Sequence, residues 1–388
     1  MFLRSSSQQS RVGKWSRSLL LTGGLSLLLA AQSLAAPVTE KVAEKTAEIT
    51  VSAFGASNIV HTSGGEVWYW GGLFDISDGK HTYRDNRPQI IKELKDTVSV
   101  QSSSVGPVVL KKDGTVWQWD IDIKRKSQDK PDGIMEFKAP KQIEGLSNIV
   151  KISISNGSAA IDKDGAVWVW HPDYYYTGPH KLTNITGAKD ISMNGDAKLL
   201  ILKEDGSVSE WNSYNNMQTN DNYTATPIKD LTGVVALSAG QGRNHLVIKK
   251  DGTVWGWGNN YGGSLGQPIT TAAKELPTLI ERPTLVKSLT DVSSITTSVG
   301  RTLVLKKDGS LWVMGYDVDE YNFPYTGNPE LRRIEGLKKV TSIAMGHYHA
   351  LAVTEDGKLW AWGGNKAGQL GDASFKSSKT PILIKSFK

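Results

Sequence analysis

Apolar and polar positions repeat along most of the chain as pairs of short strands around a polar turn. One copy, residues 108–119, reads Val-Val-Leu-Lys-Lys-Asp-Gly-Thr-Val-Trp-Gln-Trp, so two runs of strand length flank an Asp-Gly pair. An Asp-Gly pair in this setting predicts a tight β-hairpin with a type I′ turn, in which both central residues have positive φ. Each copy of the pattern therefore predicts one hairpin.

The hairpin pattern occurs seven times, and the spacing of its copies indicates a ring of similar units. The second turn residue is glycine in every copy, at Gly65, Gly114, Gly165, Gly206, Gly252, Gly309 and Gly357. Successive glycines lie 41 to 57 residues apart, which is the length of a propeller blade. The sequence therefore predicts an all-β fold, a seven-bladed β-propeller over residues 48–388.

Tryptophan marks the strand that follows each turn. Of the 13 tryptophans, all except Trp15 lie in the repeated pattern, and a pair such as Trp117 and Trp119 shares one face of its strand. Such rings can form a ligand platform, but their uniform place beside the turn favours a core between neighbouring sheets. Ser209 replaces the first Trp of the fourth copy and Met314 the second Trp of the sixth. We expect these two blades to pack differently and to be less rigid.

Two further patterns complete each predicted blade. Runs such as Lys151–Ser155 upstream of the hairpins predict inner strands, and Pro-marked segments such as Arg87–Ile91 predict outer strands. The final segment, Thr380–Ile384, is an outer strand with no hairpin after it, whereas the first copy, Glu48–Val51, has no outer strand before it. We therefore expect the C-terminal strand to complete the first blade and so to close the ring.

The first 35 residues have the layout of a secretory signal peptide. A basic start precedes an apolar run from about Leu19 to Ala31, which is too short to span a membrane, and small residues follow it. We place the cut near Ala35, because a cut after Ala36 would put Pro37 at the cleaved bond. The prediction is a secreted protein with a signal peptide at 1–35, a linker at 36–47 and no membrane span in its mature form.

Charge and cysteine content narrow the function classes. The signal segment holds four Lys or Arg and no Asp or Glu, so its removal lowers the formal net charge from +6 to +2. A nearly balanced protein gives no support for a nucleic-acid partner, which is held largely by clustered Lys and Arg. With no cysteine, the chain has no disulfide, no thiolate metal site and no catalytic thiol.

The repeat resembles that of the regulator-of-chromosome-condensation (RCC1-like) propellers. The resemblance rests on Asp-Gly-x-Val-Trp-x-Trp-Gly, on the segment 344–351, and on the loop Gly363–Gly371, which Gly258–Gly266 echoes. It covers roughly residues 48–388 and implies the propeller fold. The family includes secreted bacterial inhibitors of class A β-lactamases, although this chain has longer insertions between its blades. The partners that the resemblance suggests are class A β-lactamases or penicillin-binding proteins; the nucleotide-exchange role of the nuclear member needs a partner that an exported chain does not meet.

Evidence for enzyme chemistry is sparse. The histidines have no metal-ligand spacing, although His347 and His349 can share a face, and no Gly-x-Ser-x-Gly, His-Glu-x-x-His or P-loop motif occurs. Carboxylates at Asp120 with Asp122, or at Asp317 with Asp319, leave one alternative, a hydrolase or lyase acting on a cell-surface polysaccharide at the propeller mouth. We predict no catalytic residue, no metal and no cofactor, and hence a monomeric, non-enzymatic binding scaffold.

Tyrosine is concentrated in three of the insertions that follow the hairpins. These insertions leave one rim of the ring, because each follows the same strand of its blade. Tyr beside Ser, Asn and Asp is typical of recognition loops, although the rings can also merely cover the rim. We predict a rim that binds an extracellular or envelope protein, or a glycan, through Tyr174, Tyr175, Tyr176, Tyr223, Tyr321 and Tyr325.

Overall fold

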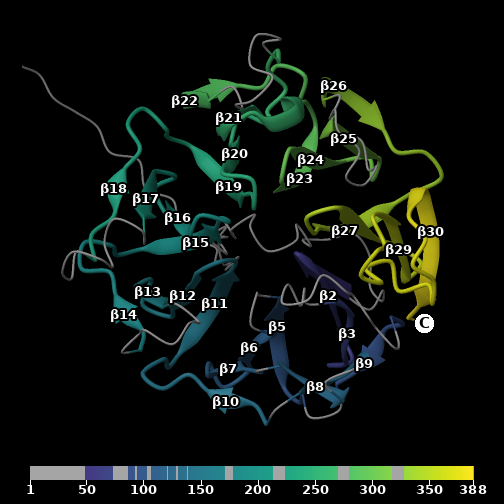
Figure 1. The fold of residues 1–388 in the computed structure, drawn as a ribbon. Coiled ribbons are helices and arrows are strands. Elements are labelled where there is room, and N and C mark those ends of the chain that lie inside the picture. The colour runs from purple at the N-terminus through teal and green to yellow at the C-terminus, as the bar shows by residue number, and fades with distance from the viewer. Residues whose placement is uncertain are drawn as a thin grey trace, which may run out of the picture. The chain divides into compact units, whose positions relative to one another are not determined.

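Seven four-stranded antiparallel sheets stand side by side around a common axis in the computed structural model (Figure 1). The structure describes residues 49–72, 86–91, 94–102, 106–119, 121–127, 130–137, 139–170, 178–212, 223–269, 279–316 and 327–387, with only the backbone for residues 121–127 and 130–137. All of them belong to the compact unit Ser33–Lys388. The predicted seven-bladed, all-β propeller is confirmed.

Each blade takes its strands in chain order, from the axis outward (Figure 1). The first three blades contain β1 (Ile49–Phe54), β2 (Ala56–Thr62), β3 (Val67–Gly72) and β4 (Gln89–Ile90); β5 (Thr97–Gln101), β6 (Val108–Lys111), β7 (Val116–Gln118) and β10 (Lys141–Gln142); and β11 (Ile149–Ile154), β12 (Ser158–Asp162), β13 (Val167–Trp170) and β14 (His180–Lys181). Within blade two, β8 (Ile121–Ser127) and β9 (Lys130–Phe137) pair as a separate two-stranded sheet.

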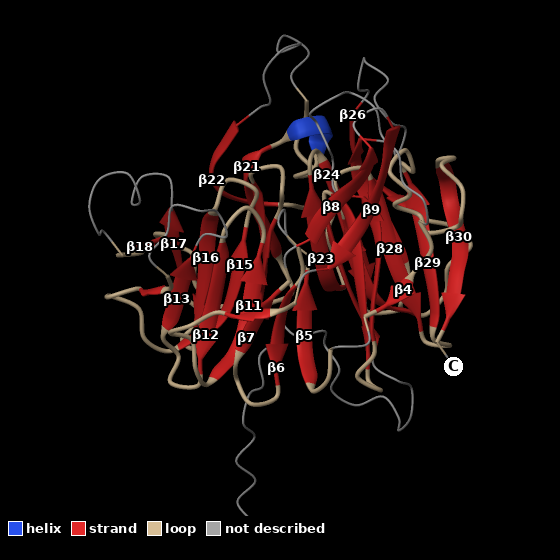
Figure 2. Cartoon of the chain, turned by 60° about the horizontal axis from the view of Figure 1, so that its bottom comes forward, coloured by secondary structure: helices blue, strands red, loops and turns tan. Residues whose placement is uncertain are grey.

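The other four blades follow the same order. They contain β15 (Ala188–Met193), β16 (Lys198–Lys203), β17 (Val208–Asn212) and β18 (Thr226–Pro227); β19 (Val234–Ala239), β20 (Asn244–Lys249), β21 (Val254–Asn259) and β22 (Leu279–Leu285); β23 (Val292–Ser298), β24 (Arg301–Lys306), β25 (Leu311–Tyr316) and β26 (Gly327–Arg333); and β27 (Val340–Met345), β28 (His349–Thr354), β29 (Lys358–Gly363) and β30 (Ser378–Ser386). One 3-10 turn, η1 (Tyr261–Gly263), follows β21 (Figure 2). Within the described ranges, no helix has the length and apolar content to cross a membrane.

The hairpin turns form as predicted, but the predicted type I′ geometry is wrong. In blade two the Gly114 N–H donates to the Lys111 carbonyl at 3.0 Å, and Gly114 alone in this turn has positive φ, at 78°. This is a type I turn followed by a glycine bulge. The Asp113 carboxylate accepts the Thr115 N–H at 2.9 Å and the Thr115 hydroxyl at 2.6 Å. These hydrogen bonds therefore explain why aspartate occupies the first position of the pair. The positive φ explains why glycine occupies the second.

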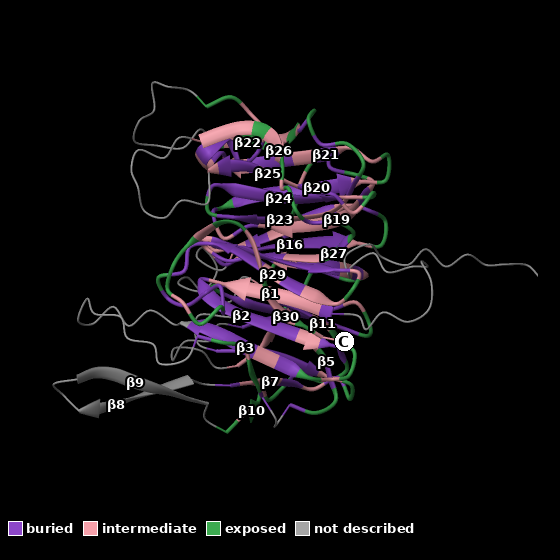
Figure 3. Ribbon diagram, turned by 90° about the vertical axis from the view of Figure 1, so that its right-hand side faces the viewer, coloured by how far each residue is buried: buried purple, intermediate pink, exposed green. Residues whose placement is uncertain are grey.

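The tryptophan pairs form the core between blades, as predicted. The second residue of each pair is buried, and these residues are Trp70, Trp119, Trp170, Trp211, Trp257, Met314 and Trp362. Each packs on the preceding blade; Trp170, for example, shares a buried cluster with Val108 and Leu110 of blade two. Figure 3 shows the resulting purple band of buried residues along the strands. Ser209 and Met314, which depart from the pattern, are also buried, at 2% and 0% exposure.

The outer strands carry a recurring proline. Pro227, Pro283, Pro329 and Pro381 lie within β18, β22, β26 and β30, and a proline directly precedes β4, β10 and β14. Proline has no N–H to offer to a further strand, so it hinders edge-to-edge pairing with another chain. The residue that marks the outer strand in the sequence therefore also protects its exposed edge.

The ring closes by direct packing of blade seven on blade one, and the expected exchange of the C-terminal strand is wrong. β30 pairs with β29 of its own blade, and β1 to β4 form blade one alone. Across the junction, Asn58 Nδ2 and Trp70 Nε1 both donate to the Gln369 carbonyl, at 2.8 and 3.0 Å, and the His347 N–H donates to the Gly55 carbonyl at 2.9 Å. In every blade the outer strand follows its hairpin, so the last copy completes the last blade.

Candidate functional site

The two ends of the ring differ in construction. Because neighbouring strands in a blade are antiparallel, the loops between the first and second strands share one end with the insertions between the third and fourth strands. We call this end the insertion face. The opposite end, the turn face, carries the Asp-Gly turns and the links between blades. In Figure 2, η1 marks the insertion face at the top, and the tan turns lie at the bottom.

The turn face is occupied by contacts that repeat from blade to blade. The carbonyl of the turn glycine accepts an N–H from the first strand of the next blade in blades two, three, four and six. These bonds are Ile149 to Gly114, Ala188 to Gly165, Val234 to Gly206 and Val340 to Gly309, at 2.9 to 3.1 Å. The turns of these four blades therefore hold each blade to the next.

At the axis, the loops of the insertion face are hydrogen-bonded to one another. Asn156 of blade three donates to the Gly195 carbonyl of blade four, and the Gly195 N–H donates to the Gly240 carbonyl of blade five at 3.4 Å. Gln241 Nε2, also in blade five, reaches the Ala53 carbonyl of blade one at 3.4 Å. Blades five and one are not neighbours, so this axial network crosses the ring.

One glycine allows the loops of blades four and five to approach closely in this network. A Cβ on Gly195 would lie 2.2 Å from the Gln241 carbonyl oxygen, a distance that no side chain tolerates. No local sequence pattern predicts that Gln241 meets Ala53, because the two residues lie 188 positions apart. The one signal in the sequence is the run Gly240-Gln241-Gly242, which gives this loop unusual backbone freedom.

The loops that form the axial network also present aromatic and charged side chains. The Phe54 and His347 rings lie 6.0 Å apart, and Tyr348 packs edge-on against His347. Arg243 is 64% exposed and pairs through Nε with Asp196 at 2.6 Å. Burial lowers the pKa of His347, so this ring is neutral at pH 7. Aromatic and arginine side chains are enriched at protein interfaces, so this surface has the composition of a binding site.

Of the predicted rim tyrosines, one lies within the described residues. Tyr223 stacks on His180 of the neighbouring blade, with ring centroids 4.5 Å apart and planes 14° from parallel. Its carbonyl accepts the Thr183 N–H at 2.9 Å, and its ring lies partly buried on the core between blades three and four. Tyr174, Tyr175, Tyr176, Tyr321 and Tyr325 lie outside the described residues. The binding role of all six remains a prediction.

The residues considered for enzyme or metal chemistry do not come together in the described part. Asp120, Asp317 and Asp319 lie outside it, and only the backbone of Asp122 is described. His349 is fully buried, with Nε2 hydrogen-bonded to Asn58 Oδ1 at 2.5 Å, whereas His347 lies beside Phe54. Burial lowers the pKa of His349 to about 3. Across the described ranges, no three His, Cys, Asp or Glu side chains are grouped to hold a metal ion.

Comparison with known families identifies the repeat. A family model described as regulator of chromosome condensation (RCC1) repeat matches residues 251–305 and 356–388, and a second model of the same description matches residues 340–369. Human E3 ubiquitin-protein ligase HERC2 is 31% identical over 159 residues, which is 39% of this chain and 3% of HERC2. Protein pim1 of Schizosaccharomyces pombe is 25% identical over 364 residues, which is 77% of this chain and 66% of pim1. The chain thus spans less than two thirds of either relative.

Solved structures show the same fold. Prp20p from Saccharomyces cerevisiae, whose binding to Gsp1p and histones was studied, has a TM-score of 0.62 and 19% identity and aligns over 83% of this chain and 86% of its own. Yeast RCC1 (Prp20) in its complex with Kap60 has a TM-score of 0.64 and 18% identity, over 90% of each chain. Propellers of this repeat type bind protein partners. At these identities the likeness to this chain is one of fold.

Proposed function

We propose that this protein is a secreted, monomeric, non-enzymatic scaffold that binds an extracellular or envelope protein. The proposal starts from a chain that carries regulator of chromosome condensation (RCC1) repeats and folds as a seven-bladed β-propeller. The observation that carries this proposal is the difference between the two ends of the ring. The turn face is used for contacts between blades, whereas the insertion face is where the insertions begin and where the half-buried Phe54 and His347 rings and the exposed Arg243 lie.

The predicted tyrosine rim would extend this binding surface away from the axis. Tyr223 lies shortly before β18, the outer strand of blade four, and its ring stacks on His180 of blade three. The insertions that hold the other five tyrosines follow β13 and β25 and so leave the same end of their blades. Tyrosine contributes a large contact area at a low cost in side-chain entropy. A partner that covers both the rim and the axial loops would gain contacts from several blades.

Export is the second part of the proposal. The layout of residues 1–35, with a basic start, a short apolar run and small residues after it, supports it. The expected product of secretion is a chain that begins at Ala36. Mass spectrometry of the protein recovered outside the cell measures this directly, and recovery of the intact chain beginning at Met1 would contradict it.

The partner class suggested by the repeat resemblance is class A β-lactamases or penicillin-binding proteins. We therefore test the mature chain against a panel of class A β-lactamases and penicillin-binding proteins. We expect it to form a one-to-one complex with one member of this panel, with no change to the covalent structure of either protein. Calorimetric titration and enzyme inhibition measure this. The same preparation is incubated with cell-wall polysaccharide, because release of sugar with turnover would favour the alternative hydrolase or lyase.

A further inference from the structure

The first tryptophan of the repeated pattern lies near the turn face, and six blades carry it. In five of them a lysine of this chain lies over the ring, with Nζ 4.0 to 5.7 Å from the centroid. These pairs are Lys385 with Trp68, Lys111 with Trp117, Lys181 with Trp168, Lys249 with Trp255 and Lys306 with Trp312. A cation over an indole ring is attracted by its negative face. An ammonium group is thus the usual cover of this ring position.

Trp360 of blade seven is the exception, since none of the described lysines or arginines lies over its ring. The covering lysine is the last residue of the second strand in blades two, five and six, and in blade seven that residue is Thr354. The Thr354 hydroxyl accepts from Trp360 Nε1 at 3.2 Å and donates to Asp356 at 2.6 Å. It satisfies the indole N–H but is too short to cover the ring.

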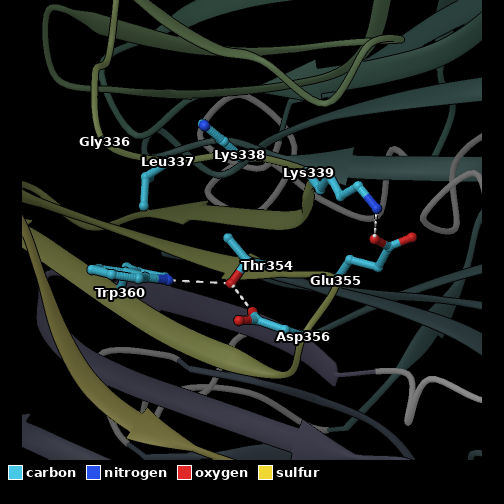
Figure 4. Close-up of a pocket in the computed structure, with 8 residues that line it drawn as sticks. All are labelled: Gly336, Leu337, Lys338, Lys339, Thr354, Glu355, Asp356 and Trp360. Atoms are coloured by element: carbon cyan, nitrogen blue, oxygen red, sulfur yellow. Dashed lines mark hydrogen bonds and ion pairs between the residues drawn. The ribbon is translucent and has the colours of Figure 1, made fainter.

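A pocket of about 370 Å³ lies at this ring, at the seam between blades six and seven. Figure 4 shows Trp360 and Leu337 on one side of it and the Lys339–Glu355 pair on the other. The volume is within the range of about 300 to 1,000 Å³ that small-ligand sites occupy. The pocket therefore has room for one side chain of a partner.

Two carboxylates, Glu355 and Asp356, line this pocket, and each forms an ion pair with a lysine of this chain. Glu355 binds Lys339 Nζ at 2.5 Å, and Asp356 binds Lys358 Nζ at 2.6 Å. Hydrogen bonds from Lys358 and Thr354 lower the pKa of Asp356 to about 2, so it is ionised at neutral pH. Both carboxylates are 43% exposed, and exposed ion pairs contribute little to stability. Both carboxylates are therefore partly open to solvent at the edge of the pocket, whose lining also includes Lys338.

We propose that this pocket is a second binding site, which receives a lysine or arginine side chain of a protein partner over Trp360. The partner's cation takes the position that the chain's own lysines hold over the other five rings. The site lies on the turn face, so it is separate from the insertion-face surface on which the proposed function rests.

The test follows the indole N–H signal of Trp360 by NMR on the mature chain with ¹⁵N-labelled tryptophan. Trp360→Phe identifies the signal by removing it. Nα-acetyl-lysine amide is expected to shift the signal saturably, with a dissociation constant in the millimolar range, whereas neutral Nα-acetyl-glutamine amide leaves it in place. The Trp117 signal is the internal control, because Lys111 already covers that ring.

A matched pair of variants separates the site from a general effect of charge. Thr354→Lys reproduces the residue found in blade two and is expected to weaken the response to the lysine probe at least tenfold. Thr354→Ser keeps the hydroxyl and should respond like the natural chain. The proposal is overturned by a Trp360 signal that does not move, that moves equally with the neutral probe, or that responds undiminished in Thr354→Lys.

Discussion

Single buried residues make the stability of the ring depend on pH. His245 is 3% exposed at the seam between blades four and five, where its ring stacks on Trp257 at 5.2 Å. Burial, with a smaller contribution from the Lys198 charge, lowers its pKa from 6.5 to about 3. The Nδ1 atom has no hydrogen-bond partner in the described part of the chain. The folded state therefore holds this histidine neutral, whereas the unfolded chain takes up a proton below about pH 6.5.

His245→Phe tests this dependence, because phenylalanine keeps a ring against Trp257 but cannot titrate. Above pH 6.5 this histidine is neutral in both states and does not change the free energy of unfolding. As the pH falls from 6.5 toward 3, only the unfolded chain takes up the proton, so the free energy of unfolding falls by about 1.4 kcal/mol per pH unit. We expect the variant to match or exceed natural stability at pH 7 and to lose less between pH 6 and 4. Urea unfolding across this range measures it; equal slopes for both proteins would contradict the assignment.

Among the elements, the hairpin turns act through the blade that follows them. A Cβ on Gly114 would lie 2.9 Å from Asn148 Cα at the start of blade three, whereas a Cβ on Gly252 meets nothing within 4 Å. Both glycines have positive φ, at 78° and 83°. The two positions share their backbone strain and differ in their contact with the next blade.

Gly114→Ala and Gly252→Ala therefore form a matched pair. We expect Gly252→Ala to cost about 1–2 kcal/mol, which is the penalty for a left-handed non-glycine residue. Gly114→Ala should cost more, because the backbone of blade three must move as well. Thermal or urea unfolding of the two variants gives the difference, and equal losses would show that the turn glycine does not hold the seam.

The elements also show what local sequence can predict. The hairpins and the tryptophan core depend on residues a few positions apart, so the pattern Asp-Gly-x-Val-Trp predicts them. The type of turn was missed because Asp-Gly suits both a type I′ turn and a type I turn with a bulge. Ring closure was missed because strand patterns alone do not say whether an outer strand pairs with the hairpin before it or after it. The contact of Gln241 with Ala53 depends on the closed ring.

At the scale of the whole molecule, the two ends of the ring differ in structure, and we propose that they differ in function. The turn face bonds blade to blade, for example from Ile149 to Gly114. The insertion face carries the axial network and the exposed Arg243. Under the proposed function, the chain binds its partner through the insertion face, and the proposed Trp360 site is a separate contact on the turn face.

The most direct test compares the two faces in one titration with the partner found in the panel. Tyr174→Ala, Tyr175→Ala and Tyr176→Ala are combined in an insertion-face variant. Its control combines Lys112→Ala, Lys250→Ala and Lys307→Ala, which alter exposed side chains of the turn face. We predict one-to-one binding that weakens at least tenfold in the first variant and is unchanged in the second. Binding that is lost in the lysine variant and kept in the tyrosine variant would contradict the account.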